Sequence, residues 1–440
     1  MIRIEEFTRA KQLLSRKNPL EMFTASPQLA TQIKQTFGKE LSPQQVVEHI
    51  VSEVRDNGDE ALFYYAKKLD RVELDSLAVS RQEILAAYDM VDKELISALK
   101  LAAKRIRDFH LTYAAKGGIV FDNHCLGRQV QPLNRVGLYV PGGTAAYPST
   151  VLMTAIPAKV AGVREIIMVS PPNKDGRVPA ATLIAADIVK VQRIFKVGGA
   201  QAIAALAFGT ESILKVEKIC GPGNIFVTLA KKMVYGAVAV DGLQGPSEIM
   251  IVADESANPS LCAADLLAQA EHDPLASVIL ITTSLDLANQ LDREMIKQLG
   301  KLKRCSIAAQ AVDRGITVIV DNIDEAIELV NLYAPEHLSL MVSNASSMVP
   351  KILNAGCIFI GENSPVVLGD YIAGPSHVLP TGGSAHFSSP LSVEDFLKTT
   401  NIIALNKATM QELTPPAIAI AKAEGLNAHA QALAIRLRAK

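Results

Sequence analysis

The sequence has 440 residues, of which 49% are hydrophobic and 20% charged, and its formal net charge is −1. This length and composition allow two or more domains with large buried cores. The balanced charge and the 5% aromatic content argue against a nucleic-acid partner, which selects for a basic excess or for aromatic stacking surfaces. No charge-free apolar run of about 18 residues and no signal peptide is seen, so we expect a cytoplasmic protein without a membrane partner.

The five cysteines are widely spaced, which excludes zinc sites of the Cys-x-x-Cys type, and an odd number fits a reducing compartment. Cys220 precedes Gly-Pro-Gly and is the one whose setting suggests a catalytic thiol. The alternative is an inert core cysteine, which is the commoner case for buried thiols.

The first third of the chain is expected to be mainly helical. Residues 1–35 resemble an arm or a small appended element. Residues 43–115 carry apolar side chains at helical spacing, which indicates a helical layer that packs on a sheet.

From Gly118 onward, strands and helices alternate. The expected strands of the first set are 118–121 and 129–132, as a possible hairpin, and then 138–140, 166–170, 194–197 and 218–220. The helices between and after them are expected over 149–161, 180–189, 200–208 and 224–234.

A second alternating set follows. Its expected strands are 248–252, 278–282, 317–320, 338–342 and 357–360, and its expected helices are 261–272, 285–299 and 323–332. Residues 361–395 read as a long loop that carries Asp370, His377 and His386, which favours a functional role. The tail is expected to be largely helical, with a break near Pro415 and Pro416.

This rhythm predicts two doubly wound, Rossmann-like α/β domains with parallel sheets. The standard glycine fingerprint is missing, because the run that starts at Gly221 has Phe226 where the third glycine belongs. The strand-end glycines therefore leave two alternatives, a dinucleotide held by other turns or merely tight turns between strand and helix.

One helix end pairs an amide with an imidazole. Gln269 and His272 are three residues apart, so on a helix they share one face, and Pro274 stops the helix. The pair is either half of a metal site or a polar helix terminus. Asp370, which follows a glycine in the long loop, could add a carboxylate. Oxygen and nitrogen ligands without cysteine suit Zn²⁺, and Mn²⁺ less well.

Glu336 and His337 follow Pro335 at the start of a predicted strand, a setting that suits general acid–base chemistry. Adjacent side chains on a strand point to opposite faces, so one of the two could be structural instead. Near the C-terminus, Glu424 and His429 are separated by Gly425 and Asn427, which we expect to break the helix between them. A solvated helix is the simpler explanation of this tail.

Seven motifs, in order, resemble the histidinol dehydrogenase family from about residue 30 to the C-terminus. They are Arg135–Gly143, Gly198–Ala205, Gly221–Asn224, Gly245–Glu248, Ala268–Asp273, Ala334–Leu338 and Gly369–Pro380. The resemblance implies oxidation of L-histidinol to L-histidine through histidinaldehyde, in two NAD-dependent steps at the end of histidine biosynthesis. It also implies one Zn²⁺ per subunit and a homodimer with shared active sites.

Site residues carried over by motif fall into four groups. The implied zinc ligands are Gln269, His272, Asp370 and, from the partner subunit, His429. His337 would accept the alcohol proton, and Glu336 would activate water. Substrate contacts would come from these six residues and from Ser247, His377 and Glu424. The NAD site would be lined by Tyr139, Gln201 and Asn224.

The predicted domain organisation follows the same resemblance. It comprises an N-terminal arm (1–35), a discontinuous first α/β domain (36–138 with 248–390), a second α/β domain on the NAD side (139–247), and a C-terminal helical extension that reaches the partner's site (391–440).

Two rival functions remain open. One is a zinc-dependent hydrolase of a small amide that uses Glu336 to activate water, and the other is a non-catalytic relative that binds a small ligand. Two residues depart from the family pattern, Ser376 where asparagine is usual and His386 where arginine is expected, and neither falls on a catalytic position.

Overall fold

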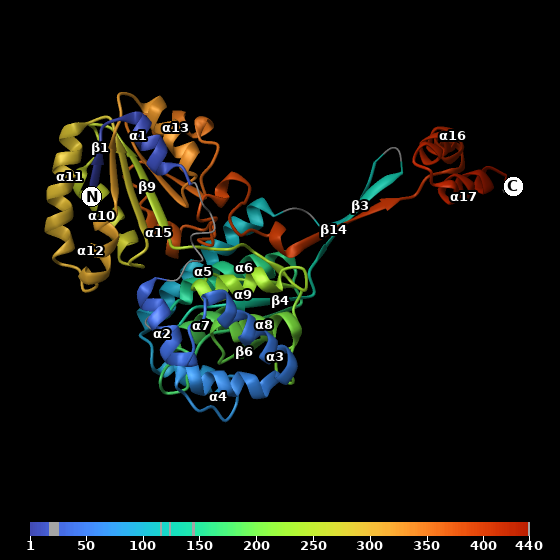
Figure 1. The fold of residues 1–440 in the computed structure, drawn as a ribbon, viewed down its shortest axis with the longest axis horizontal. Helices are drawn as coiled ribbons and strands as arrows, with labels where there is room; N and C mark the ends of the chain where they lie inside the picture. Colours follow the sequence, from blue (N-terminus) through green and yellow to red (C-terminus); the bar gives the residue numbers. More distant parts are fainter. Residues whose placement is uncertain (17–25, 115–116, 123–124, 143–145, 439–440) are drawn as a thin grey trace. The chain divides into compact units, whose positions relative to one another are not determined.

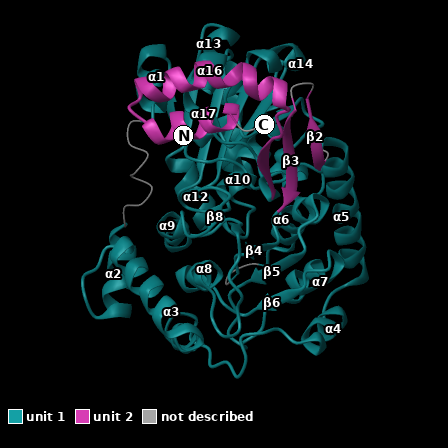
Figure 2. Cartoon of the chain, turned by 90° about the vertical axis from the view of Figure 1, so that its right-hand side faces the viewer, with its two compact units in different colours: residues 1–114, 133–396 teal, residues 115–132, 397–440 magenta. Residues whose placement is uncertain are grey.

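The computed structural model describes residues 1–16, 26–114, 117–122, 125–142 and 146–438 (Figure 1). The chain separates into two units, coloured in Figure 2. Unit 1 comprises residues 1–114 and 133–396, and unit 2 comprises residues 115–132 and 397–440. Gly143, the last residue of the first family motif, lies outside the described residues. Among the described residues, no helix is both long and apolar enough to cross a bilayer.

Unit 1 contains a six-stranded parallel sheet with the order β1-β11-β10-β9-β12-β13. Its strands are β1 (Ile2–Ile4), β9 (Glu248–Ala253), β10 (Ser277–Thr282), β11 (Ile316–Ile319), β12 (His337–Met341) and β13 (Cys357–Ile360). Strands β9 and β12 are buried along their whole length, as expected for central strands covered on both faces.

Helices cover both faces of this sheet. They are α1 (Phe7–Leu14), α10 (Pro259–Ala270), α11 (Leu285–Leu299), α12 (Cys305–Asp313), α13 (Ile323–Tyr333), α14 (Ala345–Met348) and α15 (Val366–Tyr371). Successive residues of β9 alternate between two cores: Ile249 and Ile251 pack with α10–α12, whereas Met250 and Val252 pack with α1 and α13. Short turns of 3-10 helix lie at η3 (Val349–Lys351), η4 (Ser384–His386) and η5 (Glu394–Phe396).

The second sheet of unit 1 is parallel and five-stranded, with the order β6-β5-β4-β7-β8. Its strands are β4 (Arg135–Tyr139), β5 (Glu165–Val169), β6 (Arg193–Phe195), β7 (Lys218–Cys220) and β8 (Ala239–Val240). Its helices are α2 (Pro27–Phe37), α3 (Pro43–Tyr65), α4 (Arg81–Asp89), α5 (Lys93–Tyr113), α6 (Pro148–Ala161), α7 (Ala180–Ile188), α8 (Gly199–Phe208) and α9 (Ile225–Val234). The prediction of two parallel α/β sheets is confirmed.

The front helices pack on a different sheet from the one expected. Residues 36–138 were grouped with 248–390, but α3 packs against α8 and α9, and α5 packs against α6, on the five-stranded sheet. The apolar face of α3, which includes Val47 and Val54, joins that core. Helical periodicity shows which face of a helix is buried but not which sheet it covers, and this explains the difference.

Unit 2 is a three-stranded antiparallel sheet followed by two helices. The order is β14-β3-β2, with β2 (Gly118–Phe121), β3 (Leu126–Pro132) and β14 (Leu397–Ile403), and the helices are α16 (Lys407–Ala423) and α17 (Asn427–Arg438). The expected hairpin is confirmed as β2 and β3. Strand β14 differs from the prediction, because this part of the tail was expected to be helical.

The expected helix break at Pro415 and Pro416 is wrong. Both prolines lie inside α16. Prolines remove two backbone donors, but Gln411 and Glu412, whose carbonyls lose those partners, are exposed and can bond to water. The break occurs at Gly425, whose φ of +74° is the left-handed conformation that ends helices.

Candidate active site

Glu336 and His337 lie at the start of the central strand β12. Helix α13 ends at Tyr333, and Ala334 takes a left-handed φ of +53° before Pro335 and Glu336 lead into the strand. Both Glu336 and His337 are buried. Glu336 Oε2 lies 3.5 Å from His337 Nδ1, so the two side chains meet although strand alternation would separate them. Glu336 precedes the strand, which removes the alternation constraint.

The main chain of Glu248 holds this pair. Glu248 N–H donates to Glu336 Oε2 at 2.8 Å, and its carbonyl accepts from His337 Nδ1 at 2.9 Å. Because a carbonyl only accepts, Nδ1 carries the proton, and the neutral ring has its lone pair on Nε2. The first residue of β9 therefore orients both functional groups.

The side chain of Glu248 is fixed by the N-terminal segment. Arg16 forms a fork on it, with Nη1–Oε1 at 2.8 Å and Nη2–Oε2 at 2.7 Å, and Nε donates to Tyr333 O at 2.9 Å. Gly382 N–H also donates to Oε1, at 3.1 Å. Sequence reasoning quoted Glu248 only as part of a motif and gave Arg16 no role, because nothing local links two residues so far apart in the chain.

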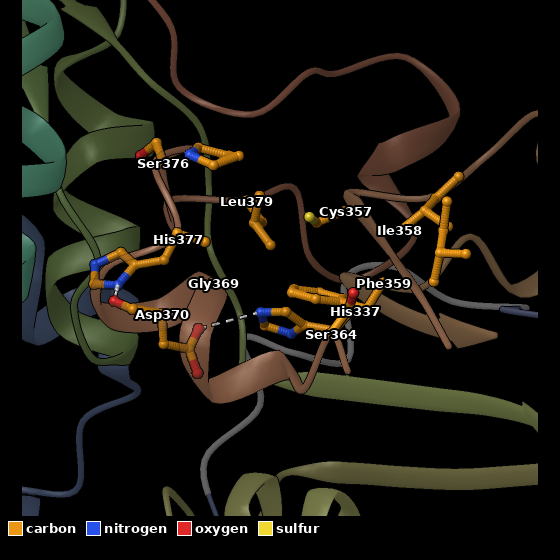
Figure 3. A pocket seen from close by; sticks show the side chains of 13 residues that line it. His337, Cys357, Ile358, Phe359, Ser364, Gly369, Asp370, Ser376, His377 and Leu379 are labelled. Carbon is orange, nitrogen blue, oxygen red and sulfur yellow. Dashed lines mark hydrogen bonds and ion pairs between the residues drawn. The ribbon is translucent and has the colours of Figure 1, made fainter. Parts of the chain in front are cut away.

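Asp370 faces the histidine from α15. Its Oδ1 lies 3.5 Å from His337 Nε2, and its backbone carbonyl accepts from His377 Nδ1 at 2.7 Å (Figure 3). His377 Nε2 lies 3.4 Å from Thr150 Oγ1, a buried hydroxyl that the sequence did not single out. The expected long loop thus contains a short helix that carries the carboxylate.

A cavity of about 270 Å³ lies beside these side chains. Its walls include His337, Asp370, His377, Cys357 and Phe359. The setting is therefore a small cavity with two imidazoles, a carboxylate and an apolar wall, which suits a small substrate that carries polar groups.

Burial and mutual charge set the pKa values here. Burial raises the pKa of Glu336 to about 8, although His337 opposes the shift. Burial alone would lower the pKa of His337, but the Glu336 and Asp370 carboxylates outweigh it and raise this pKa to about 9. Burial would raise the pKa of Asp370, yet the hydrogen bond and charge of His337 lower it below its usual range. Burial raises the pKa of the Cys357 thiol to about 11, which keeps it protonated.

Gln269 lies in the last turn of α10, and His272 follows the helix. The helix ends at Ala270, so His272 lies in the following turn, which Asp273 closes by accepting from Leu275 N–H at 2.7 Å. Proline disfavours helical backbone at the residue before it, and this ends the helix earlier than expected. His272 lies close enough to Asp370 for its charge to lower the pKa of that carboxyl.

The fit to a metal rests on the types of donor present. Gln269 is 4% exposed and offers an amide oxygen. Together with an imidazole and a carboxylate, this oxygen completes a set of donors that Zn²⁺ accepts. Within the described residues, no three His, Cys, Asp or Glu side chains gather closely enough to hold a metal by themselves.

Three predicted site residues lie elsewhere. Ser247 is half-buried next to Glu248, and its carbonyl accepts from Ser277 N–H at 2.9 Å. Glu424 is the C-cap of α16, and His429 lies in the first turn of α17; both are exposed within unit 2. The structure does not place these two with the residues of unit 1.

Tyr139, Gln201 and Asn224 line a second cavity, of about 790 Å³. Tyr139 ends β4, Gln201 lies in the first turn of α8, and Asn224 caps α9 by accepting from the N–H groups of Phe226 and Val227. Tyr139 Oη accepts from Gly199 N–H at 3.2 Å, and burial raises the pKa of Tyr139 to about 12. The two cavities share no lining residue.

The turn after β7 needs a glycine. Gly221 has a φ of +119°, and a Cβ there would lie 2.0 Å from Tyr139 O. Lys231, fully buried, donates to Gly221 O at 2.7 Å and to Asp241 Oδ1 at 2.5 Å, while Asp241 Oδ2 accepts from Gly221 N–H at 2.7 Å. This turn is thus held rigidly against the strand that carries Tyr139.

The protein has two parallel α/β sheets. A buried acid–base pair lies at a strand end of one sheet, and a separate large cavity lies at the strand ends of the other. This arrangement defines the protein as an α/β enzyme.

A family model described as histidinol dehydrogenase matches residues 34–437. The chain is 51% identical over 99% of both chains to the histidinol dehydrogenase of Dehalococcoides mccartyi (strain CBDB1), and 49% identical to that of Clostridium acetobutylicum over 92% of this chain and 95% of the relative. It is similar to the crystal structure of histidinol dehydrogenase from Elizabethkingia anophelis, with a TM-score of 0.90 and 37% identity over 99% of this chain and 97% of that one. The chain therefore belongs to the histidinol dehydrogenase family and is an oxidoreductase.

Proposed function

We propose that the chain oxidises L-histidinol to L-histidine through histidinaldehyde, in two successive NAD-dependent steps. The observation that carries this proposal is the buried Glu336–His337 pair beside a small cavity, in a chain of this family. NAD, when bound, accepts the hydride lost from the substrate carbon in each step.

His337 is the base of the first oxidation. Its Nδ1–H is engaged by the Glu248 carbonyl, so the proton that the ring loses at its pKa of about 9 leaves from Nε2. In this neutral form Nε2 has the free lone pair and accepts the hydroxyl proton of histidinol. Loss of the hydride from the same carbon then leaves the aldehyde. Glu248 fixes the ring in the tautomer that this step needs.

Glu336 is the base of the second oxidation. It takes a proton from a water molecule, whose oxygen adds to the aldehyde carbon and gives a hydrate. Loss of the second hydride from the hydrate leaves the carboxylic acid. The other route to an acid is a thiol adduct, but the cavity-lining Cys357 is held as the protonated thiol.

Gln269, His272 and Asp370 would hold one Zn²⁺ together with the partner's His429. The donor types, an amide oxygen, two imidazoles and a carboxylate, support this assignment. The ion, when bound, supplies an anchor for the imidazole and amine of the substrate.

The remaining substrate contacts are assigned to His377, Ser247 and Glu424. His377 is held by the Asp370 carbonyl and faces the cavity, which supports a direct contact. Ser247 neighbours the residue that orients the catalytic pair. Glu424 would act in the site of the partner subunit, as would His429.

Tyr139, Gln201 and Asn224 are assigned to the NAD site. They come from the ends of β4 and the starts of α8 and α9, where open α/β sheets bind nucleotides. The size of their common cavity supports a ligand of that class.

The protein is proposed to be a cytoplasmic homodimer with shared active sites. In unit 2, adjacent residues of β2 are all exposed, including Val120 at 71% and Phe121 at 50%. Since neighbours on a strand point to opposite faces, this small sheet presents apolar side chains on both faces, which supports burial by a second copy. All five cysteines are free, which fits a reducing compartment.

The test is to incubate the zinc-loaded protein with L-histidinol and NAD, to follow NADH by absorbance, and to identify the product by chromatography. We expect NADH and histidine. An absence of NADH, together with metal-dependent hydrolysis of a small amide, would favour the hydrolase instead.

A further inference from the structure

Asp70 is a half-buried residue on the wall of the large cavity that is also lined by Tyr139, Gln201 and Asn224. It ends the π-helical turn η2 (Ala66–Asp70), which extends α3 beyond Tyr65. It lines the cavity, yet its Oδ2 atom is shielded from solvent and has no hydrogen-bond partner among the described residues. An ionisable oxygen in that position is unfavourable unless a ligand donates to it.

In common dinucleotide-binding folds an acidic residue follows the second strand, whereas here two prolines come first and the nearest acidic residue, Asp175, is exposed in the turn beyond them. In those folds, an Asp or Glu after the second strand binds the hydroxyls of the adenosine ribose. The second strand of this sheet in the chain is β5, and it is followed by Ser170, Pro171 and Pro172. The prolines line the cavity and offer no acceptor side chain. Asp70 presents a carboxylate to the same cavity from outside the sheet.

The surroundings of Asp70 match an adenosine. An apolar wall comes from α2 and α3 and consists of Leu29, Ile33, Phe37, Val46 and Ile50. Such a wall suits the base, whereas the strand-end turn at Gly199 suits the phosphates. Lys174 also lines the cavity, but it is exposed and forms no ion pair with Asp70.

We propose that Asp70 accepts hydrogen bonds from the ribose hydroxyls of the adenosine half of the cofactor and repels a 2′-phosphate, so that it selects NAD over NADP. This inference rests on the proposed use of NAD. A ribose offers two adjacent hydroxyl donors, and a carboxylate offers two acceptor oxygens. A phosphate at the same place would put a second negative charge beside this carboxylate, whose Oδ2 atom is shielded from solvent, and the two charges would repel each other.

The test compares the full-length protein with Asp70→Asn and with the control Asp75→Asn. Asparagine keeps the size of the side chain and removes its charge. Asp75 is exposed, lies five residues from Asp70 and does not line the cavity, so it reports a general effect of charge. Steady-state rates are measured with NAD and with NADP at saturating histidinol.

For Asp70→Asn, we expect KM for NAD to rise about tenfold, whereas kcat and KM for histidinol should change by no more than about twofold. The ratio of kcat/KM with NADP to kcat/KM with NAD should rise at least about tenfold. For Asp75→Asn, we expect changes within about twofold. An unchanged cofactor ratio in Asp70→Asn, or an equal change in both variants, would overturn the inference.

Failure of the proposed function is distinguishable from failure of this inference. If the wild-type protein forms no NADH from histidinol, the reaction is refuted, and calorimetric titration with NAD and with NADP alone then decides the role of Asp70. Weaker NAD binding and a smaller NAD preference in Asp70→Asn support it, and identical titrations refute it.

Discussion

Replacing Arg16 by methionine tests whether the N-terminal segment holds the catalytic pair in place. The substitution removes both arms of the fork on Glu248 and leaves the main chain of Glu248 intact. Glu248 remains bonded to Gly382 N–H, but its charge loses its partner.

The size of the effect follows from burial. The Glu248 side chain is 6% exposed and that of Arg16 is 23% exposed. Loss of one partner of a buried ion pair costs about 3–5 kcal/mol, and the partial exposure of Arg16 together with the remaining Gly382 bond reduces this to about 2–3 kcal/mol. Because Glu248 bonds to both Glu336 and His337, a small shift of its backbone misplaces both bases. We therefore expect kcat to fall at least about tenfold, which corresponds to about 1.4 kcal/mol in the barrier.

The assay combines urea unfolding, to measure the free energy of unfolding, with NADH formation at saturating histidinol. KM for NAD is expected to stay unchanged, because Arg16 does not line the NAD-side cavity. Arg3→Met is the matched control. Arg3, in β1 of the same sheet, bonds to Asn289 and Asp292 of α11. The side chains of Arg3 and Asp292 are 31% and 43% exposed, so loss of this ion pair costs at most about 1 kcal/mol and leaves kcat unchanged.

Two outcomes would refute this reasoning. If Arg16→Met loses stability but keeps the wild-type kcat, the Glu248 side chain does not position the catalytic pair. If Arg3→Met lowers kcat equally, the effect belongs to the sheet as a whole.

Three further predictions follow from burial, backbone geometry and the proposed ligands. The pKa of Asp70 rises from 3.8 to about 6 on folding, so the free energy of unfolding of the wild type falls by up to about 3 kcal/mol as pH rises through this interval. Without NAD, Asp70→Asn should therefore be more stable than the wild type near pH 7 but not below about pH 4. Equal unfolding curves near pH 7 would contradict this. Gly221→Ala should lower the free energy of unfolding by about 3 kcal/mol. Gly236→Ala should lower it by only about 1 kcal/mol, because a Cβ at Gly236, which has a φ of +102°, meets nothing within 4 Å. Equal melting temperatures of the two variants would exclude the clash with the Tyr139 carbonyl. His272→Ala and His429→Ala should each lose zinc and activity. Random mixing of the subunits of these two variants should restore about a quarter of the wild-type activity, because half of the dimers are hybrids with one intact site. No recovery in verified hybrids would refute shared sites.

The alternating elements were predictable because their signals are local. Parallel strands buried on both faces are continuous apolar runs, and the helices between them are long enough to show their period. The hairpin at β2 and β3 was predicted for the same reason. Strand β14 was not, because its stretch Lys398–Asn401 is polar and exposed, and its partner β3 lies far away in the sequence.

The candidate site was predictable in its residues and less so in its connections. The Glu336–His337 dipeptide carries its own signal, whereas its support by Glu248 comes from a neighbouring strand far away in the chain. The ion pair between Arg16 and Glu248 joins an N-terminal residue to that strand, and no local pattern announces it. Asp370 was expected to lie in a loop. The helix α15 that contains it has six residues, one of them Gly369, which is too short to show a helical pattern of apolar residues.

The most direct test of the central claim is the amount of NADH formed for each molecule of L-histidinol consumed, with a limiting supply of substrate and an excess of NAD. The account predicts two NADH and one histidine for each histidinol, and a marked loss of the second NADH relative to the first in Glu336→Gln. One NADH per histidinol from the wild-type protein, with the aldehyde as the final product, would contradict it.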